Sequence, residues 1–60
     1  MDKKQKAKMK AIRLRHYADA IYEAMEFFNE NYDEQGYADA VELCDMALES
    51  ITKELIRLEG

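Results

Sequence analysis

The sequence contains two runs of apolar residues with heptad spacing, and this pattern restricts the chain to a helical fold. The first run comprises Ala7, Ala11, Leu14, Ala18, Ile21, Met25, Phe28 and Tyr32. The second run comprises Tyr37, Val41, Cys44, Leu48, Ile51, Leu55 and Leu58. Alternating steps of four and three residues place each run along one side of a helix that packs as in a coiled coil. We call each run a seam.

A short polar segment, DEQG at residues 33–36, separates the two seams. Gly36 can adopt the left-handed conformation that ends a helix. Asp2 followed by Gln5 resembles a capping box, which predicts that the first helix starts almost at residue 3. We therefore predict an all-α fold in which residues 1–60 form one antiparallel two-helix hairpin. Its parts are expected to be a helix at about 3–32, a turn at about 33–36 and a helix at about 37–59.

The size of the chain indicates that the hairpin needs support from another molecule. A domain of 60 residues buries a core that is marginal by itself. The single cysteine, Cys44, and the single histidine, His16, leave no internal disulfide and little basis for a structural metal. No cofactor is expected. A partner chain remains as the source of additional buried surface.

Each predicted helix carries more apolar surface than one neighbouring helix covers. A second stripe adjoins each seam, and together the two stripes comprise Tyr17, Ala20, Ala24, Phe27, Ala40, Leu43 and Ala47. The alanines allow helices to approach closely, and the larger side chains fill a shared core. We predict that these seven residues form an association surface for a second copy or another helical protein, giving a four-helix bundle. The alternative is that Tyr17 and Phe27 are ordinary single aromatic residues on the surface.

Charge is distributed unevenly along the chain. Residues 2–15 contain seven lysines and arginines and one aspartate, whereas residues 16–60 contain two basic and twelve acidic residues. In the first helix this order opposes the helix macrodipole, and in the second helix it agrees with it. An antiparallel pairing of the first helix with its counterpart in a second chain would place each basic start beside an acidic end. A nucleic acid or an acidic protein at the basic end would compensate the charge equally well.

Several short segments resemble the Rop family, the plasmid-encoded repressors of primer. They are Lys4-Gln5, Asn29-Glu30, the DEQ of the turn and Ala38-Asp39, together with an alternation of small and large seam residues over nearly the whole chain. The resemblance implies an antiparallel homodimeric four-helix bundle whose first helices bind paired RNA loops. Basic, polar and aromatic residues carry that binding in the family. In this sequence it implies an RNA-binding stripe of Lys3, Lys6, Lys10, Arg13 and Tyr17.

A second resemblance is local. The segment EQGYADAVELCDMAL is similar to the turn and second helix of a tetratricopeptide repeat, with Tyr37, Ala40, Cys44 and Ala47 at its packing positions. This resemblance implies a peptide-binding surface. Such repeats bury their faces by stacking, however, and one copy has no neighbour to stack on.

The sequence offers little basis for catalysis. Cys44 and His16 are the only plausible nucleophile and base, and a hairpin that turns near residue 34 separates them by roughly 13 Å along its axis. We therefore predict a non-enzymatic regulatory or adaptor protein without a small-molecule substrate, which acts through helix–helix association. One alternative is an RNA-binding regulator. Another is an inhibitor that docks a host or partner protein through an acidic face. That face comprises Asp39, Glu42, Asp45 and Glu49 on the second helix, with Glu23, Glu26 and Glu30 on the first.

The sequence also predicts a location. It contains no run of about 18 apolar residues that would span a membrane. Its basic start is not followed by the apolar run and small-residue cleavage site of a secretory signal. The expected location is the cytoplasm.

Overall fold

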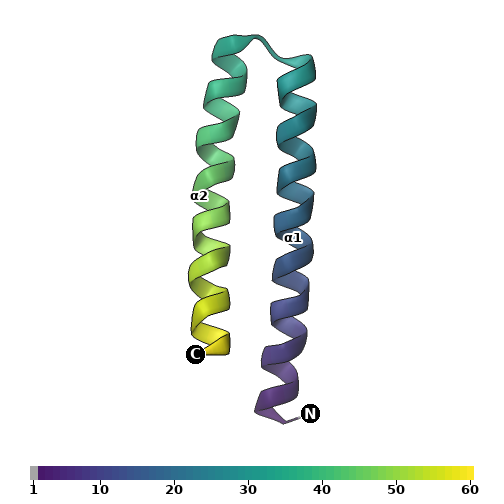
Figure 1. The fold of residues 1–60 in the computed structure, drawn as a ribbon, viewed down its shortest axis with the longest axis vertical. Coiled ribbons are helices and arrows are strands. Elements are labelled where there is room, and N and C mark those ends of the chain that lie inside the picture. Colours follow the sequence, from purple (N-terminus) through teal and green to yellow (C-terminus); the bar gives the residue numbers. More distant parts are fainter. Residues whose placement is uncertain (1) are drawn as a thin grey trace.

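The computed structural model describes residues 2–60 and contains two α-helices, α1 (Lys3–Asn31) and α2 (Glu34–Glu59). The helices run antiparallel and side by side, with both ends of the chain at the end opposite the turn, which we call the open end (Figure 1). The resulting rod measures 47 × 15 × 11 Å. The predicted all-α hairpin is confirmed.

The connection between the helices is shorter than the sequence pattern indicates. Only Tyr32 and Asp33 lie between α1 and α2. Tyr32 is extended, and its N–H donates to the carbonyl of Phe28 at 2.9 Å. The side chain of Asp33 accepts from the N–H of Gly36 at 2.7 Å and so caps the start of α2.

The expected role of Gly36 is therefore wrong. Gly36 lies inside the first turn of α2, and it does not have a positive φ. The aspartate cap starts α2 at Glu34, three residues before the expected start at residue 37. The end of α1 is instead formed by Tyr32, whose extended backbone conformation leaves the helix without a glycine.

The start of α1 agrees with the expected cap. Asp2 is its N-cap residue, and the side chain of Asp2 accepts from the N–H of Gln5 at 2.8 Å. Both helices thus begin with an aspartate that binds the N–H group three residues further on. The two caps stabilise the two helix starts separately, one at the open end and one at the turn.

The two seams face each other along the whole hairpin. Every seam residue except Tyr32 is half-buried or buried, whereas most other residues of both helices are exposed. Ala11, with 6% of its surface exposed, is the only buried residue among those described. Two helices alone therefore cover the seams only in part.

Ion pairs on either side of the seams fix the register of the helices. Lys10 bonds to Glu54 at 3.2 Å on one side, and Arg15 pairs with Glu59 on the other. Residues whose numbers add up to about 69 consequently lie opposite each other. Leu14 faces Leu55 in this register. At the open end, α1 extends beyond the last turn of α2 (Figure 1).

Candidate functional site

The predicted association residues share one side of the hairpin. The Lys10–Glu54 pair marks this side on both helices. Residues at steps of three and four from Lys10 along α1, and from Glu54 back along α2, lie on the same side of their helices. These positions hold all seven predicted residues and Ser50, and we call them the association side: Tyr17, Ala20, Ala24, Phe27, Ala40, Leu43, Ala47 and Ser50.

The large side chains of the association side are open to solvent. Tyr17 and Phe27 are each 55% exposed, and Leu43 is 67% exposed. Ala24 and Ala40 are half-buried between the helices. The surface therefore presents large apolar side chains separated by small ones, without a charged residue among them. Such exposed apolar residues are consistent with association.

Aromatic rings join the association side to the seam at the turn. The ring centroids of Phe27 and Phe28 are 6.0 Å apart in an edge-to-face arrangement. Tyr32 lies 5.1 Å from Phe28 and 6.5 Å from Phe27 by the same measure. The three rings form one apolar cluster. It spans the seam, to which Phe28 belongs, and the association side, to which Phe27 belongs. Edge-to-face contacts of this kind are favourable for aromatic pairs.

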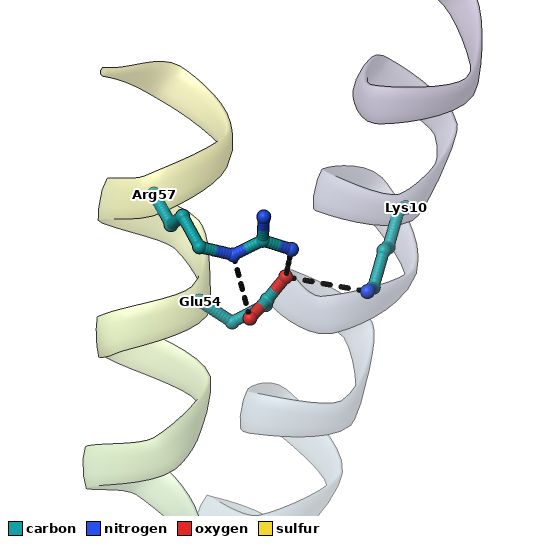
Figure 2. A network of polar contacts seen from close by, with 3 residues as sticks. All are labelled: Lys10, Glu54 and Arg57. Atoms are coloured by element: carbon teal, nitrogen blue, oxygen red, sulfur yellow. Dashed lines mark hydrogen bonds and ion pairs between the residues drawn. The ribbon is translucent and has the colours of Figure 1, made fainter. Parts of the chain in front are cut away.

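A polar cluster forms the other end of the same side (Figure 2). Glu54 accepts from Lys10 Nζ at 3.2 Å, from Arg57 Nε at 3.2 Å and from Arg57 Nη2. Hydrogen bonds from Arg57 and Lys10 lower the pKa of the Glu54 carboxyl to about 2, and the bond to Glu54 raises the pKa of Arg57. The side chain of Glu54 is therefore ionised near neutral pH, and its bond to Lys10 links α2 to α1.

The role of Glu54 was missed from the sequence. Glu54 lies beside the seam rather than on it, and its main partner on α1 is 44 positions away. A usable signal was present, because Glu54 and Arg57 are three positions apart in a helix and precede and follow seam residue Leu55. The pairing with Lys10 required the register of the two helices.

The predicted RNA-binding stripe continues the association side toward the open end. All five of its residues are exposed, and Tyr17 lies at the boundary between the basic and the apolar part. Lys10 is held by Glu54. Within residues 2–60, the remaining basic members form no ion pair: Lys3, Lys6 and Arg13. The two candidate sites on α1 are therefore successive parts of one strip.

The opposite side of the hairpin has a different character. The Arg15–Glu59 pair marks it, and helical spacing places Glu42, Asp45 and Glu49 on α2 along the same side. Asp39 lies on the outer surface of α2. These carboxylates are exposed. We call this the acidic side, and it also exposes the large apolar side chains of Ile12, Tyr22 and Ile56.

A shallow groove lies at the open end, where α1 extends past α2. Its apolar floor includes Ala7, Ala11, Ile12 and Leu58, and its rim includes Lys4, Lys8 and Arg15. Ala7 and Ala11 belong to the seam of α1, Ile12 lies beside that seam, and Leu58 belongs to the seam of α2. The groove is thus a consequence of the unequal reach of the two helices.

Cys44 and His16 are the two remaining candidate residues. Cys44 is half-buried on the seam, and His16 is exposed on α1. No group of three or more histidine, cysteine or acidic side chains within residues 2–60 is arranged to hold a metal ion. Neither helix of this part of the chain is long and apolar enough to cross a membrane.

No protein family model matches the chain, and no curated protein and no solved structure matches it either. The features that resemble Rop therefore reduce to a two-helix antiparallel hairpin, and no relative identifies the Rop family. What the chain can do follows from its two sides and the polar cluster.

Proposed function

We propose that the chain is a non-enzymatic association module, which pairs with a second copy through its association side and acts as a small regulatory or adaptor protein. The observation that carries this proposal is the apolar surface shared by α1 and α2, with Phe27 and Leu43 more than half exposed. Pairing of two hairpins through this surface gives a four-helix bundle.

The energetics of the single hairpin support the proposal. Within residues 2–60, Ala11 is the only buried apolar residue, and no large side chain is fully buried. A lone core of this size gives little net stability. Complete burial of a side chain such as Phe27 or Leu43 stabilises by about 1.5–3 kcal/mol relative to full exposure, and the 55% and 67% of these residues that is still exposed leaves more than half of that gain to a partner. A partner on the association side would therefore contribute a large share of the total.

Charge favours a second copy as that partner. The open end carries the basic residues of α1, and the turn end carries Glu30, Asp33 and Glu34. Two copies that run antiparallel to each other bring the basic end of one toward the acidic end of the other. Opposite charges at such an interface favour encounter and fix orientation.

Mass measurement across concentration tests this proposal. Sedimentation or light scattering should give twice the 7.0 kDa of one chain, and dilution should lower mass and helicity together because association contributes to stability. A compact monomer that resists heat at low micromolar concentration would contradict it.

Nucleic-acid binding is a second candidate, and one observation favours it. Lys3, Lys6 and Arg13 are exposed on one strip of α1 next to Tyr17, without an ion pair in residues 2–60. Such a strip can contact phosphates, with the tyrosine available to stack on an unpaired base. Titration of the protein with structured RNA at several salt concentrations tests this candidate, because phosphate contacts weaken steeply with salt.

A further inference from the structure

We infer that two copies pair in a staggered antiparallel register, with the two-fold axis beside Ala24 rather than at the middle of the hairpin. This inference rests on the proposed self-association. It adds which residues of the two chains meet, and which basic residues remain outside the interface.

The position of the apolar part of the association side gives the first reason. On α1 this part runs from Tyr17 to Phe27, and on α2 from Ala40 to Ala47. In the register of the hairpin, the α2 part faces roughly residues 22–29 of α1. The apolar area is therefore centred near Ala24. The middle of α1 (Lys3–Asn31) lies about seven residues, or roughly 10 Å, closer to the open end.

Full overlap of two copies would mismatch their surfaces. An axis at the middle of α1 places Phe27 of one chain against the basic strip of the other, near Lys6, and leaves Leu43 opposite the end of the other chain's α2. Burying those charges against apolar side chains is costly. With the axis beside Ala24, residues of α1 whose numbers add up to about 48 meet across the interface. Ala20 then lies against Phe27 of the partner subunit.

The charges at the edge of this staggered interface are complementary. The turn of each copy reaches the level of Arg13 on the other, so that Asp33 and Glu34 of the partner subunit lie near Arg13. Lys3 and Lys6 project beyond the partner's turn. A parallel arrangement of two hairpins would instead bring the acidic turns together, and like charges at an interface are unfavourable.

Single-cysteine cross-linking tests the register. Two variants are made in a Cys44→Ala background, one with Ala24→Cys and the other with Tyr17→Cys. Each is oxidised at a concentration at which it is a dimer. A disulfide requires Cα atoms about 4.4–6.8 Å apart, so only a residue near the axis bonds to its own copy. We expect Ala24→Cys to form the covalent dimer and Tyr17→Cys to remain reduced. Tyr17→Cys lies near the axis of a fully overlapped dimer, and the reverse result would overturn the staggered register.

Other outcomes are also informative. If the Cys44→Ala parent is dimeric by mass and neither variant cross-links, the antiparallel pairing of the two α1 helices is wrong while self-association stands. If wild-type protein is monomeric, the proposed function and the register fail together. Mass measured before oxidation separates these cases.

Charge reversal gives a second measurement that leaves the apolar residues untouched. Arg13→Glu should raise the dimer dissociation constant by roughly 2- to 10-fold, and Glu34→Lys in the same chain should restore it. Lys6→Glu is the matched control, because Lys6 lies beyond the partner's turn and should leave the constant unchanged. An effect of Lys6→Glu equal to that of Arg13→Glu would contradict the staggered register.

Discussion

Lys10 of α1 and Glu54 of α2 are 44 positions apart in the sequence, yet their side chains bond at 3.2 Å across the hairpin. Arg57 donates to the same carboxylate from within α2. The bond joins the two helices near the open end, far from the covalent connection at the turn. It therefore holds α1 and α2 together at the end of the hairpin where no covalent connection joins them.

We expect the contribution of Glu54 to depend on pH in a defined range. Its pKa is about 2 in the folded chain against an ordinary value of 4.5, so the charged carboxylate favours the folded state. This contribution is fully present above about pH 5 and is lost as the pH falls toward 2. Glu54→Gln should therefore be less stable than wild type at pH 7, with a difference that shrinks below about pH 5. Urea denaturation followed by circular dichroism measures it.

A control separates this effect from a change in total charge. Glu23→Gln removes one negative charge from an exposed position on α1. If the difference in unfolding free energy between wild type and Glu54→Gln stays constant from pH 7 to about pH 2, the charge of Glu54 does not stabilise the folded chain through the Lys10–Glu54–Arg57 cluster.

Phe27→Lys should dissociate the assembly and lower helicity together. Phe27 is an exposed apolar side chain at the edge of the ring cluster, and a lysine there would place a charge in the proposed interface. Tyr22→Lys is the matched control, because Tyr22 is 57% exposed but lies on the acidic side. Light scattering and circular dichroism at the same concentrations compare the two. A Phe27→Lys protein of unchanged mass and helicity would exclude Phe27 from any interface.

Asp33→Ala should destabilise the hairpin by about 1 kcal/mol, because it removes the acceptor for the Gly36 N–H group at the start of α2. Asp2→Ala removes the equivalent acceptor at the start of α1. Its cost should be smaller, because the first turn of α1 extends past α2 and can fray alone. Denaturant titration of the two variants gives the comparison, and equal losses would contradict this difference.

Reversal of Lys3 and Lys6 to glutamate should abolish binding to structured RNA if the basic strip contacts phosphates. Lys4 and Lys8 provide a matched control, because their reversal changes the total charge equally from positions off the strip. Each lost phosphate contact should also reduce the slope of log affinity against log salt by about one. Equal loss in both double variants would indicate attraction by net charge rather than a defined strip.

The heptad pattern predicted the seams because it is local and repeated. Every step of three or four residues returns to the same side of a helix, so periodicity alone identifies what is half-buried. The turn was harder to predict, because Asp33 and Gly36 offer competing signals, one for starting a helix and one for ending it. In the structure the aspartate cap determines the boundary.

The association side was predictable only in pieces. Spacing identified a stripe beside each seam, but whether Ala24 and Leu43 lie on the same side of the molecule depends on how the helices pair. The Lys10–Glu54 bond supplies that information. It is also the feature that sequence periodicity alone does not show, because it joins two positions with no local relationship.

The two-residue connection has a consequence for how such a hairpin can change length. With only Tyr32 and Asp33 between the helices, α2 has no slack to slide along α1 by a heptad, which would require about 10 Å of additional chain. Growth is therefore easiest at the open end, in blocks of seven residues added to both helices. A block of two or five residues, by contrast, would rotate the new surface out of line with the stripe it extends.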